Sequence, residues 1–532
     1  MNKIWQSVAI LFTLNAALLG FAFVYENTFA AWDNEANTKD GRFRFITLSQ
    51  ILTPDTLSIN KNAEQIAEDL LKSDTLTIVK MEKKGKIDSA FLDKPGDTTA
   101  LANLIVNPGA LDDFFAALIQ EKDNALVRVA HYGDSQLEGD RVTVHIRRNL
   151  QAKFGGGGLG YVPFDDVASN SNYTRTNSGK WWRYNVFNMR RKNNSYYGLS
   201  GSVFRFAKGS NTPDSAKASK SIKIIKPDST IKLKKDTVKL IAKADTVKKT
   251  KKDTNSTKTA KALPQNGVLK NASVTYRLAK WVNYERVSLM YGQAKESFGV
   301  KCFTLDNQLI YTDSIAPLMG FANKKLNIPA GLKGFKLEFT GTTSPDLYGL
   351  QIEDTTGIIV DNYAIRGHSG DGLFRINDQY LAQQLQGTNT KLIIFQYGAN
   401  MLPYLESDKE CKYYEDAFYR LFKKFKKAAP NAAILVIGNG DMGFVKEGEE
   451  KSYPFVRCLS NVQKNAATRA GCSFWSLLDA MGGENAILTW NRKGLCALDG
   501  HLSPKGQKII ANLIFKAIMR EYNNYILKQQ NS

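Results

Sequence analysis

Two segments far apart in the sequence hold side chains that together could carry out nucleophilic catalysis. Ser135 ends a Gly-Asp-Ser tripeptide, and Asp499 stands two residues before His501 with one glycine between them. A serine that attacks an ester needs a histidine to take its proton and an acid to orient that histidine. Gly-Asp-Ser is also a common turn, and the Gly-x-Ser-x-Gly elbow of many serine hydrolases is absent. The tripeptide alone therefore leaves a plain turn and a catalytic serine both open.

The chain has four histidines, so the candidates for the base are few. His131 lies inside the apolar segment before the serine, and His145 follows the serine among basic residues. Both positions favour a structural role. His368 belongs to the segment RGHSGD, whereas His501 lies just before a predicted helix with a carboxylate beside it. His368 and His501 therefore remain as candidates for the base.

A strand and a helix are predicted to position Ser135. Val127 and Val129 belong to a short apolar run with β-branched residues, which is typical of a buried strand. After the turn, apolar residues from Leu137 to Phe154 recur at helical spacing. A serine at the carboxyl end of a parallel strand lies where open α/β sheets bind their ligands.

The order of elements predicts an α/β unit that is interrupted by a β-rich segment. In residues 109–160 and 361–525 strands alternate with helices, which predicts a parallel sheet. Residues 161–360 hold short alternating strands separated by Gly, Asn and Asp, which is typical of an antiparallel β-sandwich. The predicted fold class is α/β: a three-layer α/β/α arrangement, in which a parallel sheet lies between two layers of helices, with an inserted antiparallel β-sandwich. Its clearest predicted elements are helices at 406–427, 455–469 and 504–522 and strands at 391–397, 432–437 and 473–478.

Much of the positive charge lies in one stretch of low complexity. Residues 209–262 hold 15 lysines against 5 aspartates, which accounts for +10 of the net charge of +21. This stretch has too few apolar residues to offset the entropy of ordering, so we predict a disordered loop. It also lacks the aromatic residues on which nucleic-acid bases stack, and we therefore expect no nucleic-acid partner.

The N-terminus predicts export. Residues 8–24 form an apolar run with few interruptions, at the border between the core of a signal peptide and a short membrane anchor. We expect a periplasmic or extracellular protein in which residues 1–31 are a cleaved signal peptide or an anchor in the inner membrane. Residues 32–108 are an N-terminal extension without a functional signal. The five cysteines are scattered, and no pair has the spacing of metal ligands.

Four short segments, taken together, resemble the successive blocks of the SGNH (GDSL) hydrolase superfamily. They are GDS ending at Ser135, RGHSGD containing Gly370, GAN ending at Asn400 and DGH ending at His501. The resemblance implies that Ser135 is the nucleophile and His501 the base, oriented by Asp499. It also implies an oxyanion hole made of the backbone N–H groups of Ser135 and Gly370 and the side chain of Asn400, with no metal or cofactor.

Two residues depart from the family pattern. Met401 follows Asn400 where the family usually has Asp, and Leu498 stands where the family usually has its acid. With only Gly500 between the acid and the histidine, the loop must bend, and a positive φ at this glycine allows it. We expect a triad with Asp499; the alternative is a serine–histidine dyad in which Asp499 only caps the loop.

Residues 126–510 resemble a narrower group, the peptidoglycan O-acetylesterases with a carbohydrate-binding-like β-sandwich inserted after the first α/β unit. The resemblance rests on the segments HYGDS, KFGG, FW and MGG, and it implies removal of acetyl groups from cell-wall glycan, the expected partner. Transfer of acetyl to a sugar hydroxyl and a non-catalytic wall-binding protein remain as alternatives. In the sandwich we expect Trp181, Trp182 and Tyr184 to contact glycan.

Overall fold

The computed structural model describes residues 104–187, 196–207 and 269–531, with shorter stretches at 13, 15–21, 23–24, 60–72, 78, 80 and 87–91. The lysine-rich stretch 209–262 lies outside these ranges, as does part of the apolar run 8–24. Among the helices within the ranges, none is both long and apolar enough to cross a membrane.

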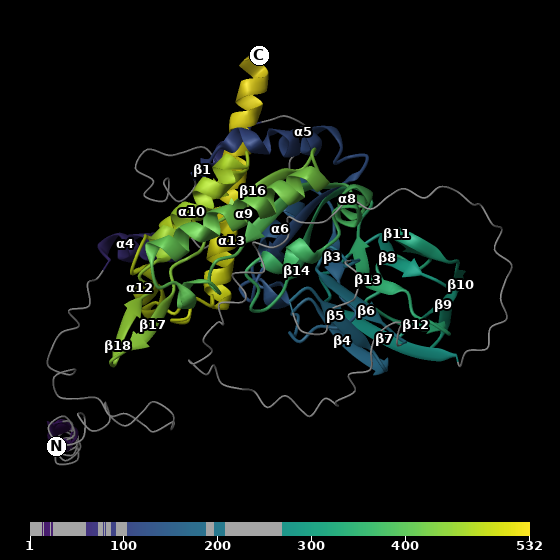
Figure 1. The fold of residues 1–532 in the computed structure, drawn as a ribbon, viewed down its shortest axis with the longest axis horizontal. Coiled ribbons are helices and arrows are strands. Elements are labelled where there is room, and N and C mark those ends of the chain that lie inside the picture. Colours follow the sequence, from purple (N-terminus) through teal and green to yellow (C-terminus); the bar gives the residue numbers. More distant parts are fainter. Residues whose placement is uncertain are drawn as a thin grey trace, which may run out of the picture.

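A six-stranded sheet forms the centre of the α/β unit, and Figure 1 labels its strands β1, β16 and β14. The strand order is β1-β19-β16-β15-β2-β14. All its neighbouring strands run parallel except β1, which pairs antiparallel with β19 at one edge. The parallel sheet predicted from alternating strands and helices is therefore confirmed. The bounds are β1 Ile105–Val106, β2 Leu126–Gly133, β14 Gly357–Ala364, β15 Thr390–Gln396, β16 Ala433–Ile437 and β19 Ser473–Trp475.

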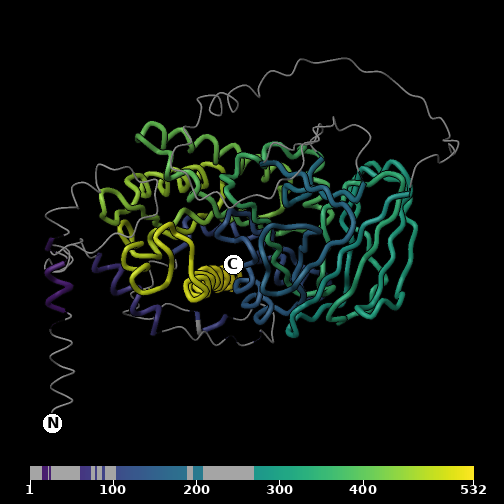
Figure 2. Tube along the Cα trace, turned by 90° about the horizontal axis from the view of Figure 1, so that it is seen from below, coloured from purple at the N-terminus to yellow at the C-terminus, as the bar shows by residue number. Residues whose placement is uncertain are grey.

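Helices cover both faces of this sheet, and successive side chains of β2 point to opposite faces. Val127 and Val129 of β2 join the hydrophobic cluster under α5, α6 and α13, whereas Ala130 and Tyr132 join the cluster under α8, α9 and α10. Figure 2 shows α13 end-on beside the sheet. The bounds are α5 Asp112–Gln120, α6 Thr143–Phe154, α8 Asp378–Gly387, α9 Asp408–Ala428, α10 Val456–Arg469 and α13 Pro504–Asn531.

Two antiparallel sheets follow α6 in the chain and lie at one end of the molecule (Figures 1 and 2). One has the order β10-β9-β12-β7-β4 and the other β11-β8-β13-β6-β5, with β3 paired to β13. Both contribute to one hydrophobic cluster, for example through Phe339 of β12 and Leu350 of β13. The bounds are β3 Gly158–Val162, β4 Tyr173–Gly179, β5 Trp182–Asn185, β6 Ser202–Arg205, β7 Lys270–Leu278, β8 Arg286–Ala294, β9 Phe298–Phe303, β10 Leu309–Ile315, β11 Leu318–Leu326, β12 Gly334–Gly341 and β13 Asp346–Glu353.

The chain passes from the parallel to the antiparallel sheets, and back again, a few residues before the boundaries predicted at 160/161 and 360/361. β3 starts at Gly158 and already pairs with β13 of the antiparallel sheet. β14 starts at Gly357 and pairs with β2 of the parallel sheet, so the boundary placed between 360 and 361 falls inside β14. β13 is buried along its whole length and β14 along most of it, and only a short turn separates them, which is why the residue pattern did not separate them.

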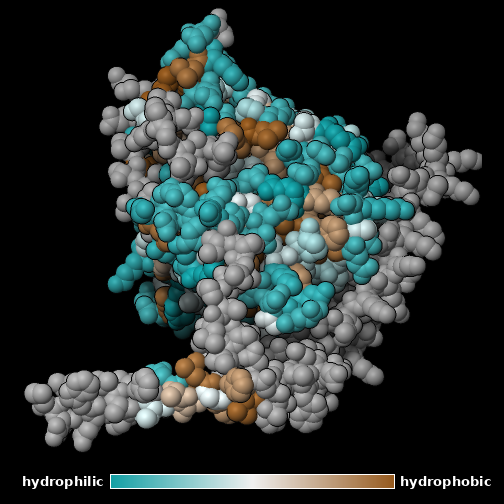
Figure 3. Space-filling model, turned by 90° about the vertical axis from the view of Figure 1, so that its left-hand side faces the viewer, coloured by the Kyte–Doolittle hydropathy of each residue, from teal (hydrophilic) through white to brown (hydrophobic). Residues whose placement is uncertain are grey.

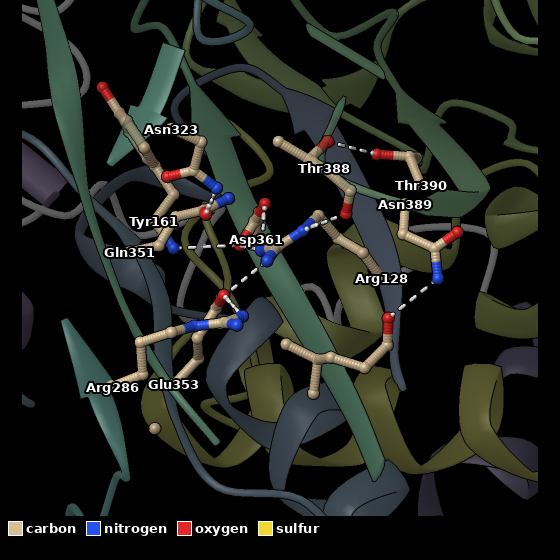
Figure 4. Close-up of polar contacts among 12 residues, drawn as sticks. Arg128, Tyr161, Arg286, Asn323, Gln351, Glu353, Asp361, Thr388, Asn389 and Thr390 are labelled. Carbon is tan, nitrogen blue, oxygen red and sulfur yellow. Dashed lines mark hydrogen bonds and ion pairs between the residues drawn. The ribbon is translucent and has the colours of Figure 1, made fainter. Parts of the chain in front are cut away.

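A buried ion-pair network joins the antiparallel sheets to the parallel sheet (Figure 4). The Arg128 guanidinium on β2 donates to Asp361 on β14 at 2.9 Å and to Glu353 on β13 at 2.6 Å. Arg286 on β8 donates to the second oxygen of Glu353 at 2.8 Å, and the backbone N–H of Tyr161 on β3 donates to Asp361 at 2.9 Å. The network thus links strands from both units by charge-assisted hydrogen bonds.

We expect Arg128→Ala to destabilise the protein by about 3–5 kcal/mol, because it leaves the buried Asp361 without its counter-charge and Glu353 with Arg286 alone. The side chains of Glu353 and Asp361 are 0% exposed and that of Arg128 is 2% exposed. Arg286→Ala is the matched control: its side chain is 29% exposed, so water replaces part of the contact and the loss should be smaller. Chemical unfolding of both variants measures the difference, and equal losses would contradict this account.

Two predicted elements differ in length from the structure. The predicted strand 473–478 ends at Trp475, because the Ser476 side chain accepts a hydrogen bond from Asp479 N–H and caps the helix α11 Leu477–Met481. The last helix runs to Asn531 rather than to 522. A disulfide joins Cys411 of α9 to Cys458 of α10, a pairing that the sequence did not predict.

Candidate active site

The turn that carries Ser135 begins where three parallel strands end together. Gly133, the last residue of β2, lies opposite Ala364 at the end of β14 and Gln396 at the end of β15. A Cβ on Gly133 would lie 2.5 Å from Leu137 Cδ1 and 2.9 Å from the Gln396 carbonyl oxygen, so only glycine fits. The segments RGHSGD and GAN follow β14 and β15, and both therefore start at the same edge of the sheet as the serine.

His501 reaches this edge from the loop before α13. Its Nε2 lies 2.9 Å from Ser135 Oγ, which is the distance of a hydrogen bond between a nucleophile and its base. The Gln136 side chain donates to the Gly500 carbonyl at 2.8 Å and so ties the histidine loop to the serine turn. The structure therefore brings the predicted nucleophile and the predicted base together.

Asp499 reaches the other nitrogen of His501 despite the short spacing. Gly500 adopts φ +86°, and His501 Nδ1 lies 3.1 Å from Asp499 Oδ1, which also accepts the His501 backbone N–H at 3.1 Å. This hydrogen bond raises the pKa of His501 above its ordinary value and lowers the pKa of Asp499. The bend predicted at Gly500 is present, and the three side chains have the geometry of a triad.

Of the two further donors predicted for the oxyanion hole, Asn400 contacts the serine turn, and Gly370 contacts His368, which Asn400 also contacts. Asn400 Nδ2 donates to Asp134 Oδ2 at 3.0 Å and to the His368 carbonyl oxygen at 3.2 Å. Gly370 has φ +91°, and its N–H donates to His368 Nδ1 at 3.2 Å. Both donors thus have protein acceptors here, and an oxyanion would have to replace or share these bonds.

We expect Asn400→Ala to lower turnover roughly 100- to 1000-fold, the loss found when one oxyanion donor is removed. Steady-state rates on a chromogenic acetyl ester measure it. Because Asn400 also contacts Asp134 and His368, the melting temperature must be compared with that of the parent. A folded variant with near-normal turnover would remove Asn400 from the mechanism.

The other histidines are buried or bonded within the fold. His131 is 0% exposed and lies 3.2 Å from Gln396 Oε1 and 3.0 Å from Thr143 Oγ1, and burial lowers its pKa to about 3. Burial lowers the pKa of His368 to about 4, and its Nδ1 accepts from Gly370. These two rings are therefore neutral near pH 7.

Residues that the sequence reasoning missed surround the serine. Asp134 is 1% exposed, and burial raises the pKa of its carboxyl group to about 6. It accepts from the Gln136 backbone N–H at 2.9 Å as well as from Asn400, so it orients both neighbours. Arg141 donates to the Ser135 carbonyl oxygen at 3.1 Å. In the sequence, the position of Asp134 directly before Ser135 in the Gly-Asp-Ser tripeptide was the feature that could have indicated this role.

The aromatic residues predicted to contact glycan are instead packed. Tyr184 is buried, which contradicts an exposed platform at this position. Trp181 is half-buried: its ring stacks on Phe164 at 5.5 Å, and its indole N–H donates to the Ser273 carbonyl oxygen. Trp182 is half-buried against the cluster under α8 and α9. An alternating pattern places such residues on one face but does not say whether that face is covered.

Within the described ranges, no group of three or more His, Cys, Asp or Glu side chains could hold a metal ion. The expectation that no metal or cofactor takes part stays a prediction.

No protein-family model matches the chain, and no curated protein sequence matches it either. Among solved structures, the chain is similar to a peptidoglycan O-acetylesterase with a TM-score of 0.54 and 19% identity; the match covers 77% of this chain and 97% of the other.

Weaker likenesses include a family two carbohydrate esterase from Clostridium thermocellum, with a TM-score of 0.23 and 11% identity over 47% of this chain and 93% of that one. A protein described as a GDSL-like lipase from Bacteroides ovatus has a TM-score of 0.21 and 12% identity, over 46% and 82% of the two chains. At these identities a likeness concerns the fold alone. The chain has the fold of a solved peptidoglycan O-acetylesterase.

Proposed function

We propose that this protein is a serine esterase that removes O-acetyl groups from cell-wall glycan. The observation that carries the proposal is the 2.9 Å contact of Ser135 Oγ with His501 Nε2, with Asp499 3.1 Å from the other ring nitrogen. This arrangement supplies a nucleophile, a base and an orienting acid. The substrate class is supported by the fold likeness to a peptidoglycan O-acetylesterase, which extends over 77% of the chain.

In the first half of the reaction, Ser135 Oγ attacks the acetyl carbonyl carbon while His501 Nε2 takes the hydroxyl proton. The negative charge on the carbonyl oxygen is held by N–H donors of Ser135, Gly370 and Asn400. The bond from the carbonyl carbon to the sugar oxygen then breaks, and His501 gives its proton to that oxygen. The glycan leaves with a free hydroxyl, and the acetyl group stays on Ser135.

In the second half, water attacks the acetyl-serine while His501 takes a proton from the water. Collapse of the tetrahedral intermediate releases acetate, and His501 returns the proton to Ser135 Oγ. Asp499 stabilises the imidazolium ion that forms in each half. No step of this scheme needs an oxidant, a reductant or a second substrate other than water.

The test is acetate release from purified O-acetylated peptidoglycan, with acetylated xylan as the comparison. We expect release from peptidoglycan by the parent and none above background by Ser135→Ala. Acetate from xylan or a small ester but not from peptidoglycan would contradict the proposed substrate. Acetyl groups appearing on an added glycan acceptor in place of free acetate would show a transferase.

We also propose that the protein is exported. The apolar residues Leu18, Phe21 and Phe23 near the N-terminus are each more than half exposed. Figure 3 shows a small group of apolar, brown atoms at its lower edge, apart from the other coloured atoms. The disulfide between Cys411 and Cys458 suits an oxidising compartment. Cell fractionation tests this, and recovery of full-length protein from the cytoplasm with both thiols reduced would contradict it.

A further inference from the structure

Phe187, two residues beyond the end of β5, is an exposed aromatic side chain on a firmly held backbone. Its side chain is 47% exposed, whereas its neighbour Val186 is fully buried. The Val186 N–H donates to the Gly201 carbonyl at 2.9 Å, and the Val186 carbonyl accepts from the Arg375 side chain. The Phe187 N–H donates to Asn185 Oδ1 at 3.0 Å. These bonds hold the backbone at Val186 and Phe187, from which the exposed ring projects.

The exposed ring lies against the residue that both predicted oxyanion donors contact. Its centroid is 5.8 Å from that of the His368 ring, in an edge-to-face arrangement with an interplanar angle of 81°. His368 in turn accepts from Asn400 Nδ2 through its carbonyl oxygen and from Gly370 N–H through Nδ1. A Cβ on Gly367 would be 3.8 Å from the Phe187 ring, so the ring also lies over the start of this turn.

The inserted segment therefore delivers an aromatic surface to the oxyanion side of the site. We propose that Phe187 determines specificity for polymeric glycan by stacking on the sugar ring next to the one that carries the acetyl group. This proposal rests on the proposed function. An acetyl carbonyl placed between Ser135 and the oxyanion donors leaves the rest of a glycan chain to run along the rim of the site. On that side the exposed Phe187 ring lines the rim, and it packs on the buried ring of His368.

The chemistry of the contact favours a sugar ring over another ligand. One face of a pyranose ring presents C–H groups, which are attracted to the negative face of an aromatic ring, and the stack removes apolar area from water on both partners. A phenyl ring has no hydrogen-bonding group, so it selects for ring shape rather than for a particular substituent. A small acetyl ester has no adjacent sugar and cannot make this contact.

The test compares O-acetylated glycan fragments with a small chromogenic ester in Phe187→Ala. We expect the ratio of kcat/KM on glycan to kcat/KM on the small ester to fall roughly three- to tenfold, mainly through KM, because one aromatic stack is lost. Phe187→Trp should restore the ratio. As a control, Leu309→Ala removes a side chain that is 57% exposed on β10, the strand at the far edge of the antiparallel sheets, and should leave the ratio unchanged (Figure 1).

Binding of the same fragments to Ser135→Ala, with and without Phe187→Ala, gives a readout that does not depend on turnover. We expect the dissociation constant to rise by a similar factor. An equal loss of activity on both substrates with unchanged binding would show that Phe187 only supports His368, and an unchanged ratio would overturn the proposal. If the parent releases no acetate from glycan, the proposed function has failed, and the binding experiment then decides separately on Phe187.

Discussion

Replacing Ser135 with alanine should lower ester turnover by roughly 10⁵- to 10⁶-fold, as removal of the serine does in comparable triads. The variant keeps His501 and the oxyanion donors but has no oxygen to attack the carbonyl carbon. The lost hydroxyl contacts one side chain, His501 at 2.9 Å, so the fold should be unaffected. Rates on a chromogenic acetyl ester, with a melting curve for each protein, measure the effect.

A serine away from the site serves as the control for this substitution. Ser178 is exposed on β4, and Ser178→Ala should keep both the activity and the melting temperature of the parent. If Ser135→Ala retains more than a small percentage of the parent activity while folded, another residue is the nucleophile. The roles of the two other triad residues, His501 and Asp499, would then need a new interpretation.

Replacing Asp499 with asparagine should lower turnover by two or more orders of magnitude, toward the roughly 10⁴-fold loss seen when a triad aspartate becomes an amide. The amide keeps the size of the side chain but no longer stabilises the imidazolium ion. Because the Asp499 side chain is 60% exposed, water screens part of its charge, which favours the lower end of this range. A variant within about threefold of the parent would show that Ser135 and His501 act as a dyad.

The same variant should change the pH dependence in a defined direction. The hydrogen bond to Asp499 raises the pKa of His501, and the base works only when it is neutral. The acid limb of kcat/KM in the parent should therefore lie above pH 6.5, the ordinary histidine value. In Asp499→Asn the carboxylate that raises the pKa of His501 is absent. The acid limb of kcat/KM should therefore move to lower pH, although the maximal rate falls. An unmoved limb would mean that Asp499 does not act on the charge of His501.

Local patterns were enough to predict the elements that carry the chemistry. The apolar run at Val127 and Val129 and the helical spacing after it predicted β2 and α6, and glycine at position 500 indicated the bend that brings Asp499 to His501. These features are short-range, because they follow from residue type and spacing within one element. The order of the four blocks then placed them at one edge of the sheet.

Long-range contacts could not be read from the sequence. The bond of Gln136 to Gly500 joins residues 364 positions apart, and Arg128 contacts Glu353 across 225 positions. A polar residue on a buried strand signals that a partner exists but not which one. The error at Tyr184 has the same origin, because burial of an aromatic side chain depends on what packs over it, and no local pattern contains that information.

The most direct test of the central claim is covalent labelling with a serine-reactive phosphonate, followed by peptide mapping. The account predicts one phosphonyl group per chain, on Ser135, with ester hydrolysis lost in proportion to labelling. Ser135→Ala should not be labelled, and His501→Ala should be labelled much more slowly than the parent. A label on another residue, or full hydrolytic activity in protein that is completely labelled at Ser135, would contradict it.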